Sequence, residues 1–162
     1  MNRMTQPDPS EDTRLFRPDA FFLKPWRGWG VVRDAAGRTI DRYEARGHGR
    51  SGSRSAAAEQ VYTFESGRVT AVEWDILSDD EDHYYARDLK SGVEARGRNL
   101  GKDFRWSFEA PAPGLLGRFF KARTTSTFTL ATPTTAFSFA ETRRLGRLLV
   151  TYTTFYEQLD RP

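Results

Sequence analysis

The most regular stretch of the chain runs Lys102-Asp103-Phe104-Arg105-Trp106-Ser107-Phe108-Glu109. Its three aromatic residues occupy every second position, and polar residues fill the positions between them. A period of two belongs to an extended strand, because successive side chains of a strand point to opposite faces of a sheet. We therefore expect a β-strand here with one dry face, and we expect Arg105 and Glu109 to face solvent.

A second stretch, residues 68–77, shows the same alternation. Val72, Trp74 and Ile76 fall on one face, whereas Glu73 and Asp75 fall on the other face and are expected to meet solvent. This pattern is typical of antiparallel sheet, in which one face packs on the core and the other face is wet.

Turn signals recur at short intervals along the chain, and no segment has the periodicity of a long helix. The expected strands are 30–34, 38–46, 58–64, 68–77, 83–88, 93–98, 102–109, 124–130, 134–141 and 147–156, with a flexible loop at 47–55 and a helical turn or continued strand at 115–122. Because nearly all connections are short, strands that are neighbours in sequence should be neighbours in the sheet. A meander of about nine or ten strands tends to close, since closure removes its exposed edges.

We therefore predict an all-β fold, namely a single antiparallel up-and-down β-barrel of the lipocalin or calycin kind. A two-sheet sandwich is the alternative, although sandwiches usually need longer crossover connections. A chain of 162 residues fits one domain. Residues 1–17 are rich in proline and acidic groups and poor in apolar groups, so we expect a disordered N-terminal tail there and the β-barrel domain over 18–160.

The composition excludes several classes of protein. No cysteine is present, so disulfides and thiolate chemistry are ruled out. The net charge is +3 and the arginines are scattered along the chain, which gives little support for nucleic-acid binding. The sequence holds no apolar run long enough to span a membrane, no signal-peptide core and no lipoprotein cysteine, so we expect a cytoplasmic protein.

Residues spread over 21–111 form a further pattern, made by Phe21, Phe22, the run 28–34 (Gly-Trp-Gly-Val-Val-Arg-Asp), Gly37, Arg38, Glu59, Tyr62, Phe64, Gly67, Arg68, Trp74, Tyr85, Gly97, Asn99, Leu100 and Trp106. In this pattern the chain resembles an uncharacterised bacterial family of lipocalin-like proteins, many of which are described as lipoproteins. The resemblance implies a calycin-like barrel and implies no particular activity. The chain departs from the family at Ser138 and Phe139, where relatives carry Asn-Arg, so any role of that pair does not carry over.

Lipocalins carry Gly-x-Trp on the first strand, and that tryptophan closes one end of the barrel beneath an arginine from the last strand. By this resemblance, Trp26 and Trp29 are candidates for the closing ring. Arg144 and Arg147 are candidates for the cation that would lie over it. The resemblance implies a structural role for these residues.

The inward face of the barrel should carry eight candidate ligand-binding residues, which are Tyr62, Phe64, Val72, Trp74, Ile76, Phe104, Trp106 and Phe108. An aromatic-lined cavity suits a small hydrophobic molecule as the partner of this protein. The same rings could instead fill the barrel and leave a structural or interaction domain with a solid core. A third interpretation is a calycin-class enzyme, which needs titratable groups that converge inside the barrel.

The sequence offers no catalytic residue, no metal site and no cofactor motif. His48 and His83 are expected in exposed loops, without the spaced partners that a zinc site requires. The acidic run 79–82 lacks the glycine and the spacing of a calcium loop and is expected to be a solvated turn. The chain also lacks a nucleophile motif and a phosphate-binding glycine loop.

Overall fold

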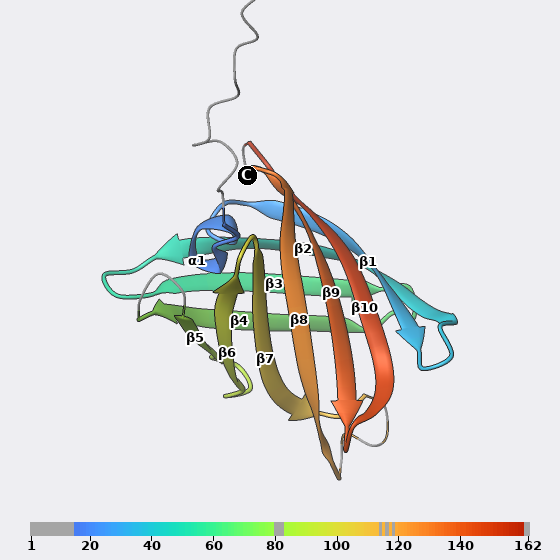
Figure 1. Ribbon diagram of the computed structural model, residues 1–162. Helices are drawn as coiled ribbons and strands as arrows, with labels where there is room; N and C mark the ends of the chain where they lie inside the picture. Colours follow the sequence, from blue (N-terminus) through green and yellow to red (C-terminus); the bar gives the residue numbers. More distant parts are fainter. Residues whose placement is uncertain (1–14, 80–82, 114, 116, 118, 161–162) are drawn as a thin grey trace, which may run out of the picture.

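The computed structural model describes residues 15–79, 83–113, 115, 117 and 119–160, and these residues form a closed β-barrel. Each strand pairs antiparallel with the next strand along the chain, and the first strand pairs with the last. Figure 1 shows β8 to β10 crossing in front of β2 to β4, with α1 near the end of the barrel where β1 begins. The expected all-β, up-and-down barrel is confirmed.

One short helix and ten strands make up the described fold. In chain order they are α1 (Pro18–Phe21), β1 (Trp26–Asp34), β2 (Thr39–Ser51), β3 (Ala56–Phe64), β4 (Val69–Ser78), β5 (His83–Asp88), β6 (Glu94–Leu100), β7 (Asp103–Pro111), β8 (Lys121–Thr132), β9 (Thr135–Arg144) and β10 (Arg147–Gln158).

The closing seam of the barrel joins β1 to β10. Its register runs without a shift from Trp26 opposite Gln158 to Asp34 opposite Val150. Because every strand then has two neighbours, the sheet presents no continuous free edge to other molecules.

The alternation read from the sequence describes the two faces of the sheet correctly. On β7, Phe104 and Trp106 are buried while Arg105 is exposed. On β4, Trp74 and Ile76 are buried. The aromatic positions of both strands therefore point into the barrel, as expected.

The loop expected at 47–55 is wrong over 47–51, because β2 continues through Ser51, and the connection to β3 is confined to residues 52–55. The glycines there mark close approach of another segment instead of a turn. A Cβ atom on Gly47 would lie 2.5 Å from the ring of Trp26, and one on Gly49 would lie 2.7 Å from the backbone of Leu23. The start of β1 therefore packs on Gly47, and the segment that precedes β1 packs on Gly49.

That preceding segment closes one end of the barrel with aromatic rings. Phe16 is completely buried, and its ring centroid lies 5.0 Å from that of Phe128, 5.2 Å from that of Phe21 and 5.9 Å from that of Phe104. The tail expected over 1–17 is therefore wrong at Phe16, whose apolar ring belongs to the core. Residues 1–14 of that tail lie outside the described residues.

Hydrogen bonds to the barrel hold this segment in place. The side-chain amide of Asn99 donates to the carbonyl of Phe16, and the side-chain amide of Gln158 donates to the carbonyl of Phe21, both at 2.9 Å. The amide of Gly49 donates to the carbonyl of Leu23 at 3.0 Å. We call residues 16–25 the plug, because they cover this end of the barrel from the inside.

Replacing Phe16 tests the plug. Phe16→Ala leaves a cavity among buried rings, so we expect the free energy of unfolding to fall by about 3 kcal/mol. The matched control Leu15→Ala removes a neighbouring side chain that is 40% exposed, and it should change that free energy by about 0.5 kcal/mol or less. Urea unfolding followed by tryptophan fluorescence measures both values. Equal effects of the two variants would contradict a packed plug.

Candidate functional site

The interior of the barrel contains an open cavity of about 420 Å³. The ring of Phe22 from the plug lies at its floor, and turn residues such as Arg68, Ser91 and Pro113 lie at its mouth. Its volume falls within the range of small-molecule sites, which is roughly 300–1,000 Å³. The barrel is thus packed at the plug end and hollow at the other end.

The cavity has a mouth because the hairpin of β5 and β6 is shorter than the strands on either side of it, β4 and β7. β5 pairs with β4 only over residues 74–78 of β4, and β6 pairs with β7 only as far as Phe108. Within the described part of the chain, residues 69–72 of β4 and 109–111 of β7 therefore have no strand partner on the side of this hairpin. The cavity opens between these two strand ends, where Thr70, Val72, Ala110 and Pro111 line it.

An aromatic wall forms one side of the cavity. The ring centroids of Trp74 and Trp106 lie 5.0 Å apart, and those of Trp74 and Phe108 lie 5.7 Å apart. Six of the eight candidate ligand-binding residues line the cavity, namely Tyr62, Phe64, Val72, Trp74, Trp106 and Phe108. The other two, Ile76 and Phe104, are buried in the packed core outside the cavity lining.

A hydroxyl-rich wall continues from β7 onto β8, β9 and β10, and it was not expected from the sequence. Its members are Thr124, Ser126, Ser138, Thr142, Tyr152, Thr154 and Tyr156, with Tyr43 beside them. The missed signal is the period of two that places Thr124 and Ser126 on the same face as buried Phe128.

Hydrogen bonds within this wall pair the hydroxyl groups. The hydroxyls of Tyr43 and Thr154 lie 2.6 Å apart, and those of Thr124 and Thr142 lie 2.8 Å apart. Tyr43 reaches from β2 across β1 to β10, and this is possible because a Cβ atom on Gly30 would lie 2.0 Å from the Tyr43 ring. Because each hydroxyl can accept more than one hydrogen bond, the wall can still bind polar atoms of a ligand.

Burial controls the ionisation of the tyrosines in the cavity. It raises the pKa of Tyr43, Tyr62, Tyr152 and Tyr156 above the ordinary value of 10.0. These hydroxyls are therefore neutral at physiological pH and offer hydrogen-bond donors without charge.

The carboxylate of Asp88 lines the cavity but is committed to its own turn. It accepts hydrogen bonds from the amides of Glu73 at 2.9 Å and Ser91 at 3.2 Å and from the Ser91 hydroxyl. Burial alone would raise the pKa of Asp88, but these hydrogen bonds outweigh that effect and hold the pKa below its usual range. Asp88 is therefore an ionised structural group of the β5–β6 turn.

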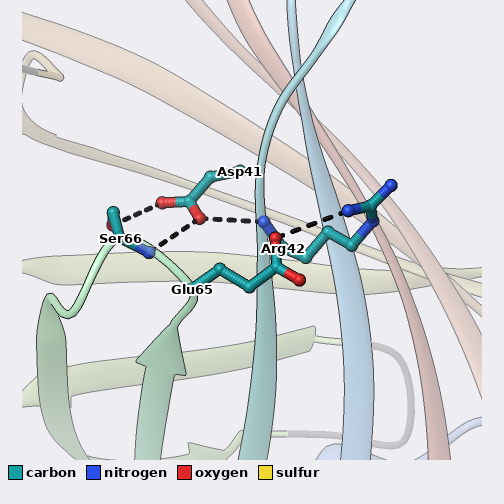
Figure 2. Close-up of polar contacts among 4 residues, drawn as sticks. All are labelled: Asp41, Arg42, Glu65 and Ser66. Atoms are coloured by element: carbon teal, nitrogen blue, oxygen red, sulfur yellow. Dashed lines mark hydrogen bonds and ion pairs between the residues drawn. The ribbon is translucent and has the colours of Figure 1, made fainter.

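A polar cluster holds the β3–β4 turn at the mouth (Figure 2). Asp41 on β2 accepts a hydrogen bond from the Ser66 hydroxyl at 2.7 Å and another from the Ser66 amide at 3.3 Å. The guanidinium of Arg42 contacts the carboxylate of Glu65 at 3.4 Å. The Ser66 hydrogen bonds are the main reason why the pKa of Asp41 lies below its usual value. The turn ends at Arg68, whose side chain lines the cavity.

The closing ring that the lipocalin resemblance predicts is wrong for Trp29, Arg144 and Arg147, which do not lie at the closed end of the barrel. Trp26 is buried against Phe22 of the plug. Trp29 is 41% exposed on the outside of the barrel, where it stacks on Phe155. Arg144 lies 3.5 Å from the ring of Phe120 at the mouth, and Arg147 begins β10 at the same end. The plug, which the sequence pattern did not reveal, closes the other end, and no arginine among the residues that the structure describes lies over Trp26.

His48 lies on a strand, which corrects its expected loop position, whereas His83 begins the strand expected at 83–88. His48 is exposed on β2 with its Nε2 atom 3.8 Å from Glu59, and His83 begins β5 at the surface. Asp79 follows β4, and the rest of the acidic run, 80–82, lies outside the described residues. Among the residues that the structure describes, no group of three or more side chains could hold a metal ion.

Alkaline unfolding tests the buried state of Tyr43. A tyrosine whose folded pKa lies above its unfolded pKa stabilises the protein fully below pH 10 and loses that contribution as the pH rises. We expect wild type to lose up to about 1.4 kcal/mol more than Tyr43→Phe between pH 9 and pH 11, measured by urea unfolding. Tyr85→Phe, which removes an exposed hydroxyl, should behave as wild type. Identical pH dependence in all three proteins would contradict burial of Tyr43.

Comparison with known proteins gives a family and a fold. Among solved structures, an S-type phycobiliprotein lyase from Guillardia theta is similar, with a TM-score of 0.62 and 10% identity over 89% of this chain and 92% of that chain. This similarity confirms the lipocalin-like barrel. No curated protein matches the sequence. No helix in the described residues is long and apolar enough to cross a membrane.

The family profile that matches the sequence covers residues 2–135, a longer span than the 21–111 expected from individual residues. The expectation of a family without an established function is confirmed, and the lipoprotein character of its members stays a prediction. The chain belongs to the family described as protein of unknown function DUF3833.

Proposed function

We propose that this protein binds a small hydrophobic molecule inside its barrel. The observation that carries the proposal is the open cavity of about 420 Å³ with the Trp74 and Trp106 rings at its side. An open cavity of this size exposes its lining rings to solvent, and removing apolar surface from water is favourable. A ligand that fills the cavity removes these rings and its own apolar surface from water.

The two walls favour a ligand with an apolar body and a few polar atoms. The aromatic rings of β4 and β7 would contact the apolar body, while the neutral hydroxyls of β8, β9 and β10 would orient the polar atoms. The similar barrel from Guillardia theta is a phycobiliprotein lyase, which supports a ligand-handling role for a barrel of this shape.

The two alternatives have less support. A structural domain with a solid core would have a filled interior, whereas this barrel has an open cavity. A calycin-class enzyme needs an acid and a base that converge on a substrate. Asp88 is the carboxylate among the described lining residues, and its oxygens are already hydrogen-bonded to the β5–β6 turn.

Filling the cavity tests the proposal. The neutral fluorophore N-phenyl-1-naphthylamine should bind wild type, and its emission should rise when the tryptophans are excited. In Ala140→Phe a ring occupies the cavity beside Tyr152, so we expect at least a tenfold loss of affinity. Thr153→Phe places the same ring on the exposed outer face of β10 and should leave binding unchanged.

Thermal unfolding of both variants shows that the barrel is intact. Two results would contradict the proposal: no binding of the fluorophore by wild type, or equal binding by wild type and Ala140→Phe.

A further inference from the structure

The β3–β4 turn presents Arg68 to the cavity in a fixed position. Gly67 adopts a φ of +86°, and the amide of Phe64 donates to the carbonyl of Arg68 at 2.9 Å. The cluster of Asp41 and Ser66 in Figure 2 ties this turn to β2. The backbone that carries Arg68 is thus held from two sides.

The guanidinium of Arg68 lies against the cavity wall. Its Cζ atom is 3.9 Å from the ring centroid of Phe64, a ring that is buried and packs on Tyr43 with centroids 5.1 Å apart. The charge of Arg68 also reaches into the cavity, because it partly offsets the rise that burial causes in the pKa of Tyr152. Arg68 is therefore a cation at the edge of a site whose other charged group in the described lining is Asp88, which is bound to its own turn.

The described carboxylates near Arg68 have other partners. Asp41 feels the positive charge of Arg68, which helps to lower the pKa of Asp41, but its hydrogen bonds come from Ser66 and from the amide of Arg42. Glu65 contacts Arg42, and Asp88 bonds to its own turn. Within the described residues no carboxylate lies at ion-pair distance from Arg68. Its charge is therefore available to a ligand.

A guanidinium stacked on a ring still presents its N–H edge. That edge matches a planar carboxylate, which can accept two parallel hydrogen bonds from it. The hydroxyl of Tyr152 lies among the cavity residues that could donate a further hydrogen bond.

From this placement we infer that the ligand is an amphipathic carboxylic acid, with its carboxylate on Arg68 at the mouth and its apolar chain along Trp74 and Trp106. The inference rests on the proposed function and adds the chemical class of the ligand. A fatty acid is the simplest molecule of this class. A neutral molecule with the same chain would fill the cavity but leave Arg68 unpaired.

A matched pair of ligands tests the inference at pH 7.5. Dodecanoic acid and dodecanol share the same chain and differ at the head group, and each would displace N-phenyl-1-naphthylamine from the protein. We expect wild type to bind the acid about fivefold more tightly than the alcohol. In Arg68→Gln that preference should disappear while the affinity for the alcohol stays within about twofold. Higher salt should weaken only the binding of the acid to wild type.

Arg147→Gln is the control variant, because it removes the same charge at the same end of the barrel from a side chain outside the cavity lining. It should keep the preference of wild type for the acid. Equal affinity of wild type for acid and alcohol, or an unchanged preference in Arg68→Gln, would overturn the inference and leave the proposed function standing. Failure of wild type to bind the fluorophore and both ligands would overturn the proposed function itself.

Discussion

A closed sheet of ten strands encloses more space than its own inward side chains fill, and this constraint explains the rest of the molecule. The diameter of a barrel grows with the number of strands, and at about eight strands side chains just fill the interior. With ten strands, one end needs material from outside the sheet. The plug supplies it through Phe16, Phe21 and Phe22, whose rings complete the aromatic core. No segment of the described chain fills the other end, and the cavity remains there.

The position of the cavity mouth and of Arg68 follows from the lengths of the strands and the places of the turns. A short β5–β6 hairpin leaves the mouth between β4 and β7, and the turn before β4 brings Arg68 to that mouth. The aromatic wall and the hydroxyl wall adjoin where β7 pairs with β8, because Trp106 lies opposite Ser126 and Phe108 lies opposite Thr124. A ligand with an apolar body and an acidic head group would use the rings, the hydroxyls and the cation together.

Much of the fold could be predicted from the sequence, because alternation in β4 and β7 depends on local geometry alone. The hydroxyl wall was missed because threonine favours a strand whether its side chain points inward or outward. The buried ring of Phe128 shows which face of β8 points inward, and Thr124 and Ser126 lie on that face. The glycines of β2 indicated a loop, whereas Gly47 makes room for Trp26 at the start of β1 and Gly49 makes room for Leu23 of the plug, both of which are far away in sequence. Phe16 was missed because it closely follows residues 5–14, which are proline-rich and polar, although its neighbours in space are rings.

The four tryptophans allow the most direct test of an open, ligand-binding interior, because the structure places them in three different environments. Trp74 and Trp106 line the cavity, Trp26 packs against the plug, and Trp29 lies outside the barrel. Nuclear magnetic resonance can follow the four indole N–H signals while dodecanoic acid is added to the ¹⁵N-labelled protein. The account predicts that the signals of Trp74 and Trp106 shift in a saturable way while the signal of Trp29 stays in place. A saturable shift of Trp29 alone, or no shift at Trp74 and Trp106, would contradict it.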